Sequence, residues 1–386
     1  MLKKLSETTR TDSGGKAASL GLLLRAGLPV PDGFVVPGGT LSPDTTAGRS
    51  LQQAVARALE ELGNPVVAVR SSAMDEDSTE ASAAGQYHSV IGVHGTAQVW
   101  QAITEVRASA RTSRVHHYWS HLGRAHPLSQ NPSVLVQPIV EADVSGVMFT
   151  PQHEGQSTRI EASWGLGLTV VGGVVAPDTY ELAPDRRVNS SIGNKQTRVD
   201  FSQEHGKVVT TNVTPDLRRI RSLNDATVIA LAQLGSRIAD LLGGPQDIEW
   251  ALTNNSVQIL QSRPITASLP PPKAPHPSQP TGTLNGVPGS HGTITAPARV
   301  VHGPSDFSNV QAGDIMVCPY TDPAWTPLFS IAAGIITETG GALSHAAIVA
   351  REYGIPAVLG ITAATTCIEN GALVALNGTT GTVTIL

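Results

Sequence analysis

The sequence is poor in cysteine, with only Cys318 and Cys367 among its 386 residues. Two cysteines can form at most one disulfide, which excludes a disulfide-stabilised scaffold, and no C-x-x-C pair with zinc-site spacing is present. So few cysteines in a chain of this length favour a reducing compartment.

Long apolar runs are also lacking. No window approaches about 18 uninterrupted apolar residues, so no membrane-spanning helix is predicted. Residues 1–20 are too polar for the apolar core of a signal peptide. The net charge of −5 gives no general attraction to nucleic acid or to anionic lipid. We therefore expect a cytoplasmic protein with neither nucleic-acid nor membrane partners.

What the chain does contain is an ordinary globular balance, with 40% hydrophobic and 15% charged residues. Its length predicts two or three domains. One boundary is plain, because residues 267–281 hold six prolines and almost no bulky apolar side chain. Such a run favours extended polyproline II and could span on the order of 45 Å. We predict domains at 1–266 and 282–386, joined by this linker.

The first region predicts a mixed α/β fold. Apolar spacing and glycine stops predict helices, and β-branched runs predict strands. Two alternating segments at its end predict an antiparallel pair. The predicted helices are 16–27, 51–63 and 224–244, and the predicted strands are 65–72, 132–140, 246–252 and 256–263.

The second region predicts a small β-rich domain. Short apolar runs alternate with glycine-bearing turns, and one prominent helix is predicted at 345–354. Ser344 is a candidate N-cap, which places His345 in the first helical turn. Unpaired N–H groups and the helix dipole favour negative charge there, so a neutral imidazole is a suitable phosphoryl acceptor. A bare G-G-x-x-S-H also fits a simple capping turn.

Two pairs of polar residues mark the end of the first region. Asp247 and Glu249 are two apart on a predicted strand and so share a face, which suits Mg²⁺ bridging substrate phosphates. Gln261 and Arg263 repeat this spacing on the next strand, where Arg263 could stabilise charge as a phosphoryl group moves. Isolated pairs of this kind also occur on solvated hairpins.

The segment TETGGALSHAAIVAREYGIPAVLG (337–360) resembles the phosphohistidine motif of the phosphoenolpyruvate-utilising enzymes, which include pyruvate phosphate dikinase, phosphoenolpyruvate synthase and rifampin phosphotransferase. The preceding TDPAWTPLF (321–329) is also similar. The resemblance implies that His345 is the phosphorylated residue and that 282–386 is a swivelling domain. Leu343 stands where the dikinases have a regulatory threonine.

Blocks in the first region resemble the ATP-grasp type nucleotide-binding domain of the same family, in the family's order. They include 14–36, 67–93, 134–150, 160–182 and 247–266. The resemblance implies phosphate contacts for Lys16 and Arg70, and a covering loop from Ser82 to Gly85. It also implies that the last block, which holds Asp247, Glu249, Gln261 and Arg263, binds metal and phosphate.

The resemblance implies an ATP-dependent, dikinase-type phosphotransferase that uses ATP and Mg²⁺. It would phosphorylate its own His345, release AMP and phosphate, and pass the group to a small-molecule acceptor. No acceptor domain is visible in the sequence. One alternative is therefore a subunit of a split phosphoenolpyruvate synthase-like or dikinase-like system that serves a separate acceptor-binding partner. A nucleotide-binding module without turnover is a third reading, although such a module would not need the histidine.

Overall fold

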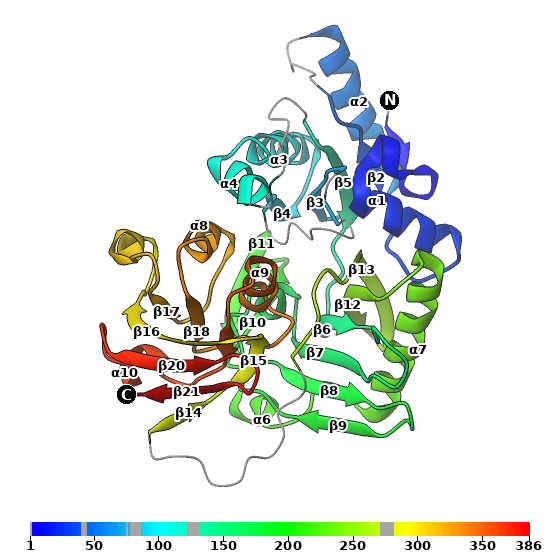
Figure 1. Ribbon diagram of the computed structural model, residues 1–386. Coiled ribbons are helices and arrows are strands. Elements are labelled where there is room, and N and C mark those ends of the chain that lie inside the picture. The colour runs from blue at the N-terminus through cyan, green and yellow to red at the C-terminus, as the bar shows by residue number, and fades with distance from the viewer. Residues whose placement is uncertain are drawn as a thin grey trace.

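The computed structural model describes residues 2–39, 45–74, 76–77, 86–121, 123, 131–270 and 282–386 (Figure 1). Two predicted site residues, Ser82 and Gly85, lie outside the described residues. So do residues 271–281, which make up most of the predicted linker. The predicted boundaries at 266 and 282 therefore stay a prediction.

The first part of the chain builds a five-stranded sheet covered by two helices. Helices α2 (Thr46–Glu61) and α3 (Thr96–Ser109) place Leu51, Val55 and Ile103 against valines of the strands. The order of the strands is β1 (Lys3–Lys4), β2 (Phe34–Val36), β5 (Ser133–Pro138), β3 (Val67–Ser72) and β4 (Ser89–Val93).

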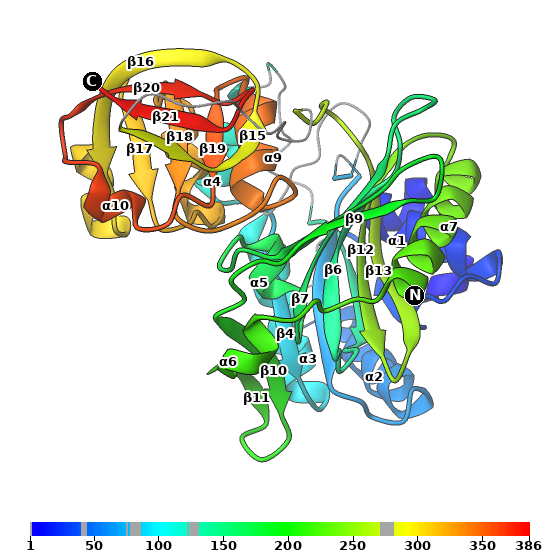
Figure 2. The same ribbon diagram turned by 90° about the horizontal axis from the view of Figure 1, so that it is seen from below.

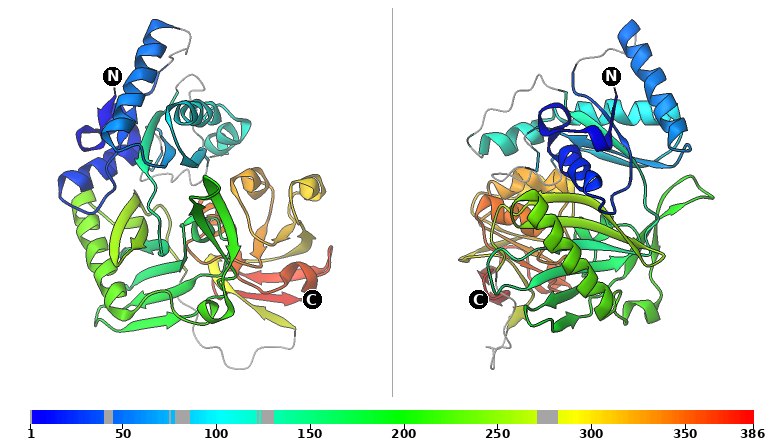
Figure 3. Two further views of the ribbon diagram at one scale, coloured as in Figure 1. Left: turned by 180° about the vertical axis from the view of Figure 1, so that it is seen from behind. Right: turned by 90° about the vertical axis from the view of Figure 1, so that its right-hand side faces the viewer.

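A second, six-stranded sheet is antiparallel throughout. Helices α1 (Arg10–Arg25) and α7 (Asp225–Leu242) lie side by side against it and bury Leu20 and Leu231 in a core with Trp250 (Figure 3). The strand order is β13 (Ser256–Pro264), β12 (Gln246–Thr253), β6 (Val144–Phe149), β7 (Thr158–Trp164), β8 (Asp178–Leu182) and β9 (Val188–Ser191).

Shorter elements surround these two sheets. A two-stranded hairpin stands apart from them, and three further helices fill the connections. They are β10 (Thr197–Ser202), β11 (Lys207–Asn212), α4 (Ser113–His121), α5 (Leu168–Val171) and α6 (Pro215–Arg218).

The last part of the chain forms an eight-stranded mixed sheet, which Figure 2 shows as a separate body beside the other two. Its longest helix is α9 (His345–Tyr353), with α8 (Thr326–Phe329) and α10 (Ala364–Cys367) much shorter. The β-rich prediction with one prominent helix is confirmed. The strand order is β14 (Thr283–Asn285), β21 (Thr382–Ile385), β20 (Leu373–Asn377), β16 (Thr293–Val300), β17 (Ile315–Cys318), β18 (Gly334–Thr337), β19 (Ala357–Leu359) and β15 (Val287–Ser290).

Two absences in the sequence have counterparts in the structure. Within the described ranges, no helix combines the length and the apolar character needed to cross a membrane. Both cysteines are free thiols, with Cys318 buried in the third sheet and Cys367 exposed. Burial raises the pKa of the Cys318 thiol, because the thiolate would lose its hydration there.

Helix α1 begins earlier than predicted, at Arg10 rather than at residue 16. The early turn is kinked at Gly14, whose φ of +79° breaks the regular helix. A side chain at Gly14 would also collide with β3, since its Cβ would lie 1.9 Å from the Ser72 carbonyl oxygen. The chain can therefore pass this close to β3 only because residue 14 has no side chain.

We expect Gly14→Ala to destabilise the protein far more than Gly27→Ala. Gly27 also has a positive φ, +73°, but a Cβ there would meet nothing within 4 Å. The Gly27 variant should thus lose about 1–2 kcal/mol from backbone strain alone. The Gly14 variant should lose at least about 2 kcal/mol more, because the clash is with backbone. Urea unfolding followed by circular dichroism measures both, and equal losses would show that the close approach does not matter.

Candidate active site

The register of the second sheet brings the predicted polar residues onto one face. Asp247 pairs with Arg263, and Glu249 pairs with Gln261, so the two predicted pairs lie directly opposite each other. The neighbouring strands extend each pair into a row across the sheet. The first row is Arg263, Asp247, Phe149 and Arg159, and the second row is Gln261, Glu249, Val147 and Glu161.

Asp247 and Arg263 form a buried ion pair, with Arg263 Nε 2.8 Å from Asp247 Oδ2. Burial raises the pKa of Asp247, although the arginine opposes this. Burial also opposes the charge of Arg263, but the carboxylates of Asp247, Asp77 and Glu249 outweigh it and raise the pKa of the guanidinium. Among the described residues, Asp247 Oδ1 is buried and has no hydrogen-bond partner. This unpaired oxygen of Asp247, together with the carboxylate of Glu249 on the same strand, forms a set of oxygen ligands that suits a hard divalent cation.

Arg70 joins the second row from the neighbouring sheet. It donates to Gln261 Oε1 at 2.5 Å, to Glu249 Oε2 at 3.1 Å and to the Leu260 carbonyl at 2.7 Å. Since Arg70 lies on β3, these contacts join the two sheets where the candidate site lies. The structure thus brings Arg70, Glu249 and Gln261 together, although 179 residues separate the arginine from the glutamate.

Lys16 is buried and paired with two carboxylates that the sequence analysis did not single out. Its Nζ lies 2.7 Å from Glu76 Oε1 and 3.3 Å from Asp77 Oδ2. Asp77 also accepts from Gln261 Nε2 at 3.1 Å, which links Lys16 to the second row. The signal in the sequence was the acidic run that follows the two serines at the end of β3.

His345 begins α9, as predicted, and is 4% exposed. Its Nδ1 lies 3.1 Å from Thr321 Oγ1, and the rings of Phe329 and His345 are nearly perpendicular, with their centres 6.3 Å apart. Ser344 is the N-cap residue of α9, as predicted, but its side chain accepts no hydrogen bond from the helix. Its hydroxyl donates to the Gly341 carbonyl at 2.8 Å, so it closes the preceding turn rather than accepting from the helix.

Helix α9 lies against the face that carries the two rows, at the centre of Figure 1. A small cavity is lined jointly by Asp247, Arg263 and Phe149 of the second sheet and by Ile348 and Arg351 of α9. The Arg351 guanidinium stands 5.9 Å from the centre of the Phe149 ring. Burial lowers the pKa of Arg351 to about 10, although the nearby carboxylates of Asp247 and Glu161 favour its charge.

The same helix also contacts the first part of the chain through α4. Tyr118 donates its hydroxyl to Glu352 Oε2 at 2.9 Å, and the His121 ring stacks on Tyr353 with the ring centres 4.2 Å apart. Helix α9 is therefore held from two sides, by α4 and by the second sheet.

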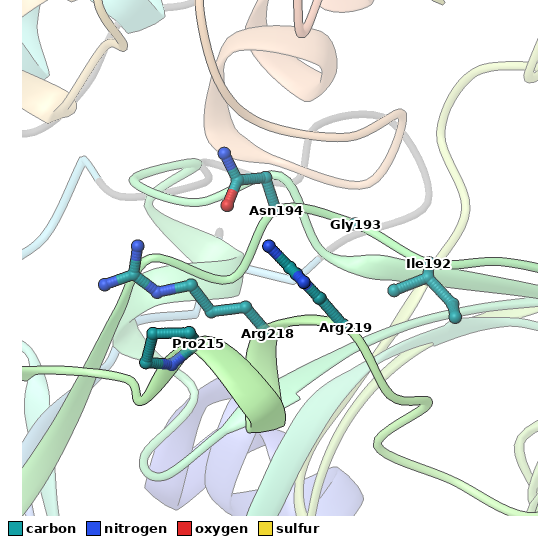
Figure 4. A pocket seen from close by; sticks show the side chains of 6 residues that line it. All are labelled: Ile192, Gly193, Asn194, Pro215, Arg218 and Arg219. Atoms are coloured by element: carbon teal, nitrogen blue, oxygen red, sulfur yellow. The ribbon is translucent and has the colours of Figure 1, made fainter.

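A separate depression of about 650 Å³ lies beside α6 (Figure 4). It is open to solvent, and Arg218 and Arg219 extend from α6 and its C-terminal end while Asn194 stands on the opposite side. None of the predicted site residues that the structure describes lines it. The rows of the second sheet are therefore the better candidate site.

Two family models match separate parts of the chain. The family model "Pyruvate phosphate dikinase, AMP/ATP-binding domain" matches residues 40–279, and "PEP-utilising enzyme, mobile domain" matches 310–381. The first match contains the two rows, and the second contains His345. The N-terminal part of this α/β protein is of the ATP-grasp type, as the sequence predicted.

Curated relatives include a probable phosphoenolpyruvate synthase of Methanothermobacter thermautotrophicus, 34% identical over 96% of this chain and 61% of that protein. The phosphoenolpyruvate synthase of Escherichia coli is 36% identical over 85% of this chain and 44% of its own length. The chain thus spans about half the length of these relatives. A solved structure, N5-carboxyaminoimidazole synthase from Aspergillus clavatus, aligns over 65% of this chain and 45% of its own, with 11% identity and a TM-score of 0.32. The two family matches, which together span both parts of the fold, place this chain in the family of phosphoenolpyruvate-utilising enzymes.

Proposed function

We propose that this chain is an ATP-dependent phosphotransferase that phosphorylates its own His345 and passes the group to a small-molecule acceptor. The observation that carries the proposal is the cavity shared by Asp247 and Arg263 with the helix that His345 begins. A nucleotide site on the rows and a phosphoryl acceptor on α9 would then face each other.

The charges around the rows suit a polyphosphate. Lys16, Arg70 and Arg263 supply fixed positive charge, and Gln261 adds an amide donor. We assign the predicted covering loop, with Ser82 and Gly85, to the same nucleotide. Asp247 and Glu249 would hold Mg²⁺, which supplies neutralisation of phosphate charge when bound.

In the proposed reaction, a ring nitrogen of His345 forms a bond to the β-phosphorus of ATP. The bond from that phosphorus to the oxygen shared with the α-phosphate breaks, and AMP leaves with the electron pair. Water then cleaves the β–γ linkage and releases phosphate, so that one phosphoryl group stays on His345. The protein's part is to position the groups and to match their charges, because this chemistry needs little else from the side chains.

His345 is nearly inaccessible in the described arrangement, so a second acceptor would need it to move. We propose that residues 282–386 swivel on the linker 267–281 between the nucleotide site and the acceptor. An extended proline-rich segment of this length could span on the order of 45 Å.

The acceptor could also belong to a separate protein. The relatives named phosphoenolpyruvate synthase are longer than this chain, which covers 61% and 44% of the two described above. Because His345 is buried where it lies, it must leave this position to meet any acceptor. This also suits, as a second candidate, a split system in which phospho-His345 docks on a partner that binds an acceptor such as pyruvate. The two candidates are separated by measuring turnover of the purified chain in two assays, one with small-molecule acceptors alone and one with an extract that contains the partner. Turnover with small molecules alone supports the first candidate, and turnover only with the extract supports the second.

We expect ATP labelled at the β position to leave its label on His345, with AMP and phosphate as products. ATP labelled at the γ position should leave the protein unlabelled and release labelled phosphate. Family resemblance is the basis for this, since a cationic, Mg²⁺-binding site alone would also suit γ-transfer with release of ADP. Protein labelling from the γ position, with ADP as product, would overturn the proposed mechanism.

A further inference from the structure

The loop before His345, residues 339–343, docks on a surface of the N-terminal part that we call the receptor. The receptor consists of Val147, Phe149, Glu161, Val170, Gly173 and Val175. Leu343 N donates to Glu161 Oε2 at 3.2 Å. Two more hydrogen bonds flank this contact: Thr339 Oγ1 donates to the Gly173 carbonyl at 2.6 Å, and Gly340 N donates to the Val175 carbonyl at 3.1 Å. The loop is thus held through backbone and side chain along its length.

Gly341 fits this receptor because it has no side chain. A Cβ at residue 341 would lie 2.3 Å from both carboxylate oxygens of Glu161, and its three nearest atoms all belong to that carboxylate. Its φ lies outside the left-handed region, so alanine would not strain the loop by itself. The need for glycine here therefore arises from docking and not from the fold of the C-terminal part.

Leu343 provides the apolar part of the same contact. Its side chain is buried in a cluster with Val147, Phe149 and Val170 of the N-terminal part. Val147 and Glu161 are neighbours in the second row of the sheet. The leucine that replaces the dikinases' threonine therefore packs on the receptor beside the carboxylate.

We propose that Glu161 is the positioning residue for phosphoryl transfer: its carboxylate receives the 341–343 loop and so fixes the start of α9, and with it His345, at the nucleotide site. This inference rests on the proposed function. Glu161 lies in the same row as Glu249, so a rigid sheet sets the distance between the docked loop and the proposed metal ligands. The Glu161 side chain contacts the loop 339–343, and we propose no contact between it and the reacting groups.

The charges around Glu161 make docking sensitive to protonation. Burial raises its pKa to about 7, although the N–H groups of Leu343 and Ala342, with Arg159 on its own strand and Arg351 on α9, favour the ionised form. When the loop leaves, the carboxyl regains water and its pKa falls toward the ordinary 4.5. The docked state thus binds the proton more tightly, so docking is favoured at low pH and weakens as pH rises through about 7.

The decisive test is a double-mutant cycle on the full chain with two readouts. One is the single-turnover rate of phospho-His345 formation, and the other is the amide-exchange protection factor of Leu343 without nucleotide. Gly341→Ala should slow labelling at least about tenfold and remove the protection, because the clash blocks docking. Glu161→Ala should lower the labelling rate roughly fivefold to hundredfold, because the buried N–H of Leu343 loses its acceptor. The double variant should be no worse than Glu161→Ala, since the space for a Cβ is then open.

Glu181→Gln is the matched control. Glu181 lies on the adjacent strand β8 and accepts from Arg159 at 3.0 Å, but its side chain is partly exposed and is not part of the receptor. Labelling and protection should stay near wild type. Glu161→Gln keeps an acceptor oxygen without a charge, so this variant should dock the loop where Glu161→Ala does not. The protection of Leu343, which in the wild type should fall between pH 4.5 and about 7, should not change with pH in the variant.

The two proposals fail in different ways. If wild type forms no phosphohistidine, the proposed function is wrong, and the exchange measurement still decides whether Glu161 holds the loop. If wild type is labelled but Gly341→Ala is labelled equally fast, or keeps the Leu343 protection, the positioning role of Glu161 is wrong. Additive losses in the double variant would also overturn it.

Discussion

Replacing His345 by alanine is expected to abolish formation of an acid-labile, base-stable phosphoprotein from ATP and Mg²⁺. The imidazole is the proposed acceptor, and alanine has no nucleophilic side chain to replace it at the first position of α9. Nucleotide affinity should change little, because the residues proposed to bind ATP belong to the N-terminal part. Radiolabelled ATP, followed by acid and base treatment of the denatured protein, measures the adduct.

His302→Ala is a suitable control for this experiment. His302 is an exposed histidine of the same C-terminal part, and its loss should leave labelling unchanged. If His345→Ala were labelled to the wild-type level, another residue would be the carrier and the reading of the 337–360 segment would be wrong.

Asp247→Asn should cost several kcal/mol of transition-state stabilisation, or roughly a thousandfold in the rate of His345 phosphorylation. The amide preserves the shape of the side chain but removes the charge that faces Arg263, together with a proposed Mg²⁺ ligand. Single-turnover labelling at saturating ATP measures the rate. In a Mg²⁺ titration, the labelling rate of the variant should rise less with Mg²⁺ concentration than the rate of the wild type.

Asp185→Asn provides the comparison, since Asp185 pairs with Arg187 on the exposed surface. It should leave the rate unchanged. A loss of only a fewfold in Asp247→Asn would remove this carboxylate from the proposed metal site and leave its contact with Arg263 as a purely structural pair.

Local patterns predicted how the polar residues are arranged on the second sheet, because strand geometry is local. Alternation places Asp247 and Glu249 on one face, and the short connection to β13 makes Gln261 and Arg263 their partners. The helix that starts at His345 was likewise predictable from the sequence around it. Helix α1 was less so, since its early start depends on the approach of Gly14 to β3.

Contacts between distant segments were not predictable in this way. Lys16 contacts Glu76 and Asp77, which lie about 60 positions away in the sequence, and Leu343 contacts Glu161, which lies 182 positions away. No spacing rule connects such residues, because their meeting depends on how sheets and domains pack. Ser344 illustrates the same limit on a small scale, because its N-cap position was predictable but the bond of its hydroxyl to the Gly341 carbonyl was not.

The grip on α9 from two sides has a thermodynamic consequence. The helix contacts α4 through Glu352 and Tyr353, and the second sheet through Arg351, so it bridges the two bodies between which a nucleotide would lie. Any nucleotide that changes the separation of those bodies must change the affinity of α9 for them. By reciprocity, departure of the helix changes nucleotide affinity by the same factor. If the chain works as proposed, nucleotide release and the departure of phospho-His345 are then linked equilibria, so a change that alters the affinity for one also alters the affinity for the other.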